Sequence, residues 1–226
     1  MEQAMQETAG DRETYAAHTN GLPKTDFLKM RDIANGIIGR RCHFAGDLQS
    51  LLSNDGCDVG NRVMQACDKM ELALAKVNFN AFADPSPKQN LTAMFEDVIV
   101  TLATVYLVRN RVRQFDMPGM QTISILYRTD TSLKDDMGGL FHSLVSLAED
   151  KDREYGASWC KRGGIGAWFT TVRKFDRLIT QVKQKGNDIW NVSDEAGSTE
   201  SLEETIKDGI NYLLLILEKR YVIYMG

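Results

Sequence analysis

The sequence has little of what marks disulfide-stabilised, zinc-binding or secreted proteins. Its four cysteines form no CxxC pair, and none of its three histidines lies at metal-ligand spacing from them. Reduced thiols of a cytoplasmic protein are therefore expected, rather than a zinc site or a disulfide framework. The polar N-terminal stretch lacks the apolar segment of a signal peptide. Apolar runs end within about ten residues, which is too short to cross a bilayer, so no membrane association is expected.

The charge balance and the missing motifs exclude several functional classes. With 27 basic and 31 acidic residues the net charge is −4, so the chain has no general attraction to nucleic acid, although a local basic pocket is still compatible with it. The sequence contains no GxSxG, no GxxxxGK[ST] and no HExxH. Serine hydrolases of the nucleophile-elbow type, P-loop proteins and zincins are therefore excluded.

Prolines are also scarce, with four in 226 residues, and the apolar residues between them recur with helical period. The chain is therefore expected to be all-α, a helical bundle. Asp26 is the expected N-cap of the first helix, and Ser198 or Thr199 that of the last. A β-like TISILY run leaves room for a short strand in a connector. Helices are expected over residues 27–52, about 60–79, about 91–115, 139–154, about 165–185 and 199–222.

The helices fall into two halves of similar pattern, which indicates an internal duplication. Aligning Glu96 with Glu203 places Thr101 opposite Asp208. The first copy has thus lost the acidic residues and is interpreted as scaffold. The expected organisation is a mobile leader over 1–25, a first helical half over 26–115, a connector over 116–138, and a second half over 139–226 that carries the site.

Three polar residues of the last helix stand out, because Glu204, Asp208 and Asn211 follow one another at spacings of four and three. This spacing places them on one line of the helix. Residues 213–217 are apolar on every side, which is typical of a buried helix. A polar line that runs into a packed interior needs a cation or a basic partner. The candidates are a divalent metal ion and the basic residues of a neighbouring helix.

A second candidate cluster is AEDKDREYGASWCKR, residues 148–162. Asp152 and Glu154 lie on the late turns of a helix that Gly156 is expected to end as an αL cap. Tyr155 and Trp159 flank that glycine beside two basic residues, and such a set can stack on a base and hold phosphate. The alternative is a capped helix end with the tryptophan packed beneath it.

A third cluster is VRKFDRL, residues 172–178. Val172, Phe175 and Ile179 are expected to face the core, which leaves Lys174 and Arg177 together on a neighbouring face. Such a pair can grip an oligophosphate. The alternatives are a solvated helix face, or simple neutralisation of the Glu204–Asp208 line as a structural salt-bridge network.

Taken in order, these segments resemble the nucleotide modification-associated domain 1 family, which is common in bacteriophages. The resemblance rests on EYGASW at residues 154–159, KFDRL at 174–178, and the pattern from Glu204 through Asp208 to Asn211 and Tyr212. More remotely, the chain is similar to the all-α nucleoside triphosphate pyrophosphohydrolases of the MazG and dimeric dUTPase type. The resemblance covers about residues 140–220. The chain departs from the MazG pattern, which has two acidic motifs where this chain has one acid pair and a Lys/Arg helix.

The resemblance implies a Mg²⁺- or Mn²⁺-dependent pyrophosphohydrolase that acts on a deoxynucleoside triphosphate, modified or unmodified, in the cytoplasm of a bacterium or a phage-infected cell. Glu204 and Asp208 would be catalytic. The implied metal ligands are Asp152, Glu154, Glu204 and Asp208; the implied nucleotide-binding residues are Tyr155, Trp159, Lys174, Arg177, Asn211 and Tyr212. A homo-oligomer is expected, with the apolar helix over residues 91–108 as its interface.

Two further functional classes stay open. The incomplete acidic set is compatible with a protein that binds or sequesters a nucleotide without turnover. The chain could also be a helical interaction module whose polar line pairs with another subunit.

Overall fold

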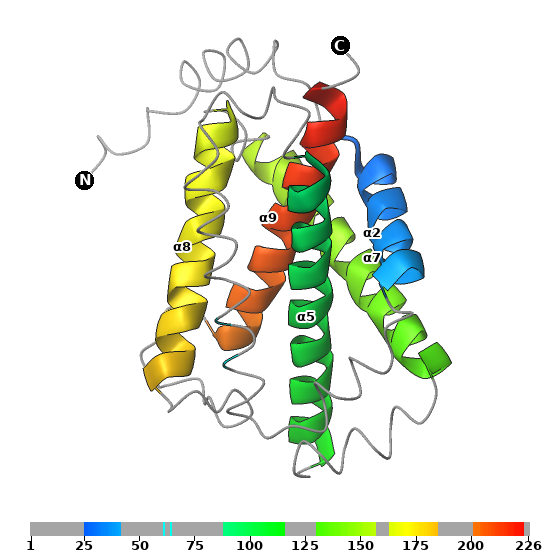
Figure 1. The fold of residues 1–226 in the computed structure, drawn as a ribbon, viewed down its shortest axis with the longest axis vertical. Helices are drawn as coiled ribbons and strands as arrows, with labels where there is room; N and C mark the ends of the chain where they lie inside the picture. Colours follow the sequence, from blue (N-terminus) through cyan, green and yellow to red (C-terminus); the bar gives the residue numbers. More distant parts are fainter. Residues whose placement is uncertain are drawn as a thin grey trace, which may run out of the picture.

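The computed structural model describes residues 25–41, 61, 64, 88–115, 130–156, 163–184 and 201–223. Within these ranges the chain forms five long helices and no strand, so the predicted all-α class is confirmed (Figure 1). Residues 1–24 of the expected leader, the TISILY run and nearly all of the helix expected over 60–79 lie outside the described residues. The helices are α2 (Phe27–Arg41), α5 (Lys88–Phe115), α7 (Asp130–Tyr155), α8 (Gly163–Gln184) and α9 (Leu202–Ile223).

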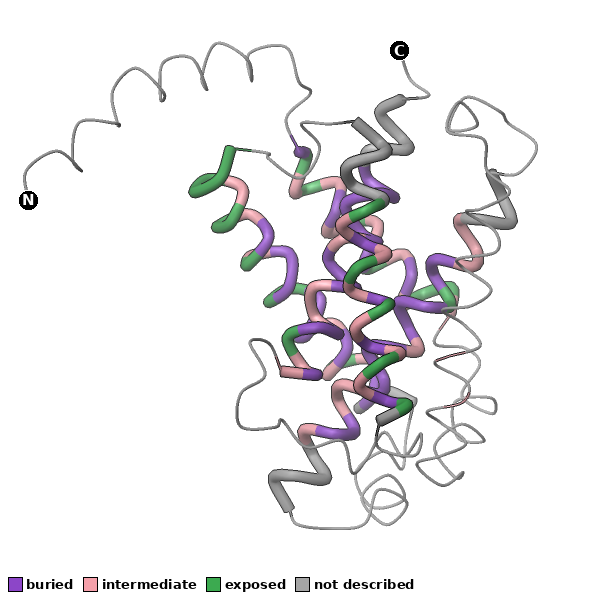
Figure 2. The backbone as a smooth tube through the Cα atoms, turned by 90° about the vertical axis from the view of Figure 1, so that its left-hand side faces the viewer, coloured by how far each residue is buried: buried purple, intermediate pink, exposed green. Residues whose placement is uncertain are grey.

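Helix α9 occupies the centre of the bundle and packs against each of the other four described helices (Figure 1). The buried residues gather toward the middle of the bundle, and the exposed ones lie toward its outside (Figure 2). Its residues Leu213–Leu217 are all buried, as the all-round apolar sequence predicts. Residues from α5, α7 and α8 complete one continuous core, in which Phe95, Phe141 and Phe175 are at most 2% exposed. None of the described helices is apolar over a length that could cross a membrane.

Side-chain caps fix where two of the helices begin. The Asp26 carboxylate accepts a hydrogen bond from the Lys29 backbone N–H at 3.0 Å, which confirms Asp26 as the N-cap of α2. At α9 the predicted caps Ser198 and Thr199 are wrong. The Ser201 hydroxyl instead accepts a bond from the Glu204 N–H at 3.1 Å, and the Glu204 carboxylate accepts one from the Ser201 N–H at 2.9 Å. This reciprocal pair is a capping box, and it starts the helix at Leu202.

Helix α7 begins at Asp130, so residues 130–138 of the expected connector are helical and the predicted start at 139 is wrong. The two glycines at 138 and 139 suggested a turn, yet a helical glycine costs only about 1 kcal/mol relative to alanine. Buried Leu133, Met137 and Leu140 outweigh that cost. The end of α7 is as predicted, because Gly156 has φ +58° and its N–H donates to the Asp152 carbonyl at 2.8 Å.

The buried carboxylate of Glu96 ties α2 to α5. Arg40 Nη2 lies 2.6 Å from Glu96 Oε1, and Arg41 Nε lies 3.0 Å from Glu96 Oε2. A carboxylate that is 5% exposed requires such compensation. Further along α5, the hydroxyls of Thr101 and Thr104 donate to the carbonyls of the preceding helical turn. In the part of α5 that aligns with Asp208 of α9, these two hydroxyls are thus satisfied within their own helix.

Candidate functional site

The Asp208 carboxylate of α9 is the point at which three helices bring charges together. Lys174 Nζ of α8 lies 2.8 Å from Asp208 Oδ2, and Lys151 Nζ of α7 lies 3.2 Å from Asp208 Oδ1. The side chains of Asp208 and Lys174 are only 20% and 17% exposed, whereas that of Lys151 is 49% exposed. We call these three residues the Asp208 cluster.

Next to the cluster, α8 and α9 pack against each other around Gly209. A Cβ atom added at Gly209 would lie 3.7 Å from Leu102 and 3.8 Å from Phe175. Phe175 is fully buried and directly follows Lys174 in the chain. The buried ring after Lys174 thus packs close to the residue after Asp208, next to the ion pair of the two charged side chains.

The electrostatics of the cluster favour the ionised carboxylate. Burial raises the pKa of Asp208, but the hydrogen bond and charge of Lys174, together with those of Lys151, outweigh it and leave that pKa below its usual value. Burial, and then the Asp208 charge, raise the pKa of Tyr212. Within the cluster, two ammonium groups therefore face one ionised carboxylate.

Asn211 and Tyr212 follow Asp208 by one helical turn. Tyr212 is half-buried and packs against the core. Asn211 is 6% exposed, and its Oδ1 atom has no hydrogen-bond partner among the described residues. An unsatisfied buried acceptor costs about 1–3 kcal/mol.

Glu204 does not join Asp208. It is exposed, and its carboxylate is held by the Ser201 N–H at 2.9 Å and by the Ser201 hydroxyl at 3.2 Å. The hydrogen bonds from the Ser201 backbone and side chain are also what lowers the pKa of Glu204. In this structure Glu204 acts as a helix cap, and the predicted polar line is buried only at its later members.

The residues predicted around the end of α7 are only partly brought together. Asp152 is half-buried, whereas Glu154 and Tyr155 are exposed, Tyr155 by 57%. Trp159 lies outside the described residues. Among the described residues, no three His, Cys, Asp or Glu side chains are grouped so as to hold a metal ion. The metal set of Asp152, Glu154, Glu204 and Asp208 therefore stays a prediction.

The predicted basic pair of α8 consists of Lys174 and Arg177, and the structure places Lys174, but not Arg177, in the Asp208 cluster. Phe175 faces the core as expected, while Val172 and Ile179 are only partly buried and the buried stripe also includes Thr171, Leu178 and Val182. Lys174 is too buried for a solvated helix face. It pairs with Asp208, which is the structural salt-bridge alternative given above for this residue. Arg177 is partly buried one turn further on.

Lys151 is the residue that the sequence reasoning missed. It follows Ala148 by three positions and Leu144 by seven, and both of these are buried. This periodicity places Lys151 at the edge of the inward-facing stripe of α7, where a charged side chain needs a partner. The spacing of Lys151 from these buried residues is therefore the sequence pattern that could have identified it.

The fold and the cluster define an all-α bundle in which two lysines from different helices contact one carboxylate. Comparisons with protein-family models, with curated proteins and with solved structures find no match. The resemblance to the nucleotide modification-associated domain 1 family therefore stays a prediction.

Proposed function

We propose that the Asp208 cluster binds the phosphate groups of a nucleotide, and that the chain is a nucleotide-binding protein. The observation that carries the proposal is the convergence of Lys151 and Lys174 on Asp208 from two different helices. Two ammonium groups thus meet at a single carboxylate. An anion of higher charge than a carboxylate can bind both of them at the same point.

A phosphate group can replace the carboxylate as partner of both lysines. It carries more negative charge and offers more acceptor oxygens, and ammonium groups bind phosphate as mobile point charges. Lys151 is half exposed and free to follow an incoming ligand. Lys174 is largely buried, so it would hold the ligand at a fixed point.

The residues beside the cluster suit the remainder of a nucleotide. Tyr212 offers a ring and a hydroxyl, and Asn211 offers an amide whose oxygen is unsatisfied among the described residues. A base or sugar that donates a hydrogen bond fits that oxygen. The resemblance of residues 154–159 and 174–178 to a nucleotide-related family supports the same ligand class.

The second candidate is the Mg²⁺- or Mn²⁺-dependent hydrolysis of a deoxynucleoside triphosphate, modified or unmodified. The observation that favours it is the acid pair Glu204 and Asp208, which α9 places one turn apart. The metal would lower the pKa of the attacking water and neutralise phosphate charge. Glu204 would have to leave Ser201, and Asp208 would have to leave both lysines. The present contacts therefore support binding better than metal-dependent turnover.

One experiment separates the two candidates. The full chain is incubated with each deoxynucleoside triphosphate and Mg²⁺, the products are separated by chromatography, and binding is measured by equilibrium dialysis. The proposal predicts saturable binding with the triphosphate unchanged. Lys174→Gln is expected to weaken binding by about tenfold or more, which is the worth of one charge-assisted hydrogen bond.

The matched control is Lys183→Gln, which removes an exposed lysine from the last turn of the same helix. It is expected to bind like the wild type. Release of monophosphate and pyrophosphate would support the hydrolase instead. If the chain shows neither binding nor turnover, the cluster is a structural ion-pair network and the interaction-module class remains.

A further inference from the structure

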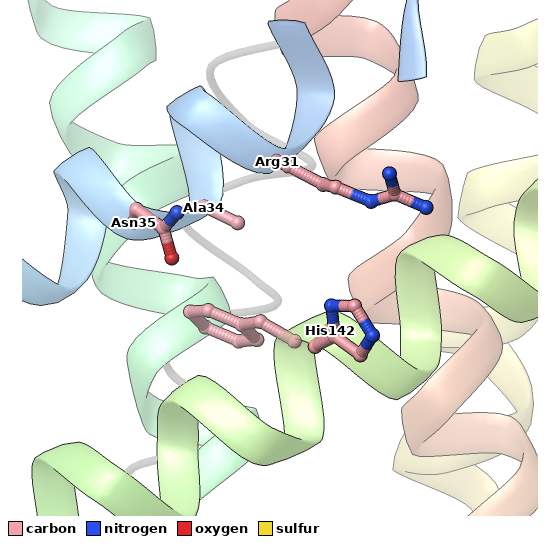
Figure 3. Close-up of a pocket in the computed structure, with 5 residues that line it drawn as sticks. Arg31, Ala34, Asn35 and His142 are labelled. Carbon is pink, nitrogen blue, oxygen red and sulfur yellow. The ribbon is translucent and has the colours of Figure 1, made fainter. Parts of the chain in front are cut away.

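A small pocket lies between α2 and α7, away from the Asp208 cluster. It is lined by Arg31, Ala34 and Asn35 of α2 and by Phe141 and His142 of α7. Figure 3 shows the side chain of Arg31 extending across the view above His142, while the side chain of Asn35 points toward α7 on the other side of the pocket. Phe141 is buried and Ala34 is 2% exposed, so the floor is apolar while the other three residues supply polar groups.

Arg31 supplies more hydrogen-bond donors than its partner uses. A guanidinium has five N–H donors, and the contact with Glu149 engages Nη2 alone, at 3.0 Å. The Nε atom of Arg31 is buried without a hydrogen-bond partner among the described residues. Asn35 and His142 add an amide and an imidazole that can each donate a hydrogen bond.

From this arrangement we propose that the pocket is a binding subsite for a small carboxylate. The planar fork of a guanidinium matches the two oxygens of a carboxylate, and such charge-assisted bidentate pairs are among the strong hydrogen bonds in proteins. The apolar floor suits a short aliphatic remainder. The proposal is independent of the Asp208 cluster and of the nucleotide proposed there.

The size of the pocket limits the ligand. The space is about 60 Å³, whereas a cavity needs at least roughly 10–15 Å³ to hold one water, so the pocket has room for a ligand of only a few non-hydrogen atoms. Acetate has four. A nucleoside or an amino acid with a large side chain is too big to enter entirely, although a carboxylate at the end of a larger molecule could.

Glu149 competes for Arg31 and therefore sets the affinity. Both side chains of the pair are about one-third exposed, at 33% and 35%, and ion pairs of this exposure are weak. A ligand carboxylate can share Arg31 or replace Glu149 at little cost. Removing the Glu149 charge should strengthen binding, which is the opposite of what a purely structural pair would show.

The test is a titration of the isotopically labelled full-length chain with sodium acetate at constant ionic strength, followed by NMR. The signals to follow are the backbone amides of residues 31–35 and 141–142 and the ring of His142. The wild type is expected to show saturable shifts. Arg31→Gln is expected to weaken binding by about tenfold or more, and Glu149→Gln to tighten it about two- to fivefold.

Matched controls exist on α7, the helix that carries Glu149 and His142. Arg153 and Asp150 form an exposed ion pair at 2.8 Å, so Arg153→Gln and Asp150→Asn remove the same charges outside the pocket and should leave acetate binding unchanged. Shifts that stay linear in acetate, or that survive in Arg31→Gln, would overturn the proposal. So would equal losses in Arg31→Gln and Arg153→Gln, or tighter Arg31-dependent binding of inorganic phosphate than of acetate. The gain expected in Glu149→Gln keeps the test valid even if Arg31→Gln fails to fold.

Discussion

Lys174 of α8 and Asp208 of α9 form an ion pair of 2.8 Å in which each side chain is at least four-fifths buried. Surface ion pairs contribute little to stability, whereas a pair at this depth leaves a costly uncompensated charge when one partner is removed. The pair thus serves both the packing of α8 on α9 and the charge of the candidate site. Its two roles lead to separate predictions.

The first prediction concerns stability. Lys174→Met should lower the free energy of unfolding by about 1–3 kcal/mol, because Asp208 then stays largely buried with Lys151 as its remaining ion-pair partner among the described residues. Urea denaturation followed by circular dichroism measures the change. Lys183→Met, at an exposed position of the same helix, should leave the midpoint nearly unchanged. Equal effects at the two positions would contradict a structural role for the pair.

The second prediction concerns pH. The pKa of Asp208 is lower in the folded chain than its ordinary value of 3.8. The stabilisation by this carboxylate is therefore fully present above the unfolded pKa and is lost as the pH falls through the lower, folded pKa. The stability difference between the wild type and Asp208→Asn should be constant at neutral pH and shrink below about pH 4. Denaturation curves at pH 7 and pH 3 check this. A stability difference that grows on acidification would contradict a lowered pKa of Asp208 in the folded chain.

The third prediction separates a cap from a catalytic acid at the start of α9. Ser201→Ala should destabilise the fold by about 0.5–2 kcal/mol, because the hydroxyl no longer accepts the bond from the Glu204 N–H. Glu204→Gln should weaken the same cap without changing nucleotide binding. Thermal unfolding and equilibrium dialysis provide the two readouts. Loss of nucleotide turnover in Glu204→Gln at unchanged stability would instead assign this residue to catalysis.

The fourth prediction concerns the Glu96 anchor between α2 and α5. Glu96→Ala removes the shared acceptor of Arg40 and Arg41, and it should lower the free energy of unfolding by about 2–4 kcal/mol. The control is Asp97→Asn. Asp97 lies 3.4 Å from Arg41 but is 64% exposed, so its replacement should cost much less. Comparable losses at the two positions would show that Glu96 is not the anchor.

Local features of the fold could be predicted from the sequence, because they depend on a few neighbouring residues. The Asp26 cap, the αL conformation of Gly156 and the burial of residues 213–217 each follow from a short pattern. The start of α7 was missed because two glycines read as a turn, while the burial of Leu133 and Met137, which keeps the helix intact, depends on helices elsewhere in the chain.

The partners of Asp208 could be predicted only in part. The sequence indicated that a buried carboxylate needs a counter-charge and offered Lys174 among the candidates. Lys151 was not named, because its approach depends on how α7 crosses α9, and these residues are 57 positions apart in the chain. Helical periodicity gives the face of each helix but not the register between helices, which the packing of large side chains such as Phe175 decides.

The most direct test of the nucleotide proposal is the dissociation constant of a deoxynucleoside triphosphate for the wild type and for Asp208→Asn, measured by equilibrium dialysis in the presence of Mg²⁺. Asp208 is the internal competitor for both lysines, so its neutralisation should tighten binding by roughly three- to tenfold, with no product formed by either protein. Weaker binding in Asp208→Asn, or a wild-type turnover that this substitution abolishes, would contradict the proposal and make Asp208 a metal-binding carboxylate.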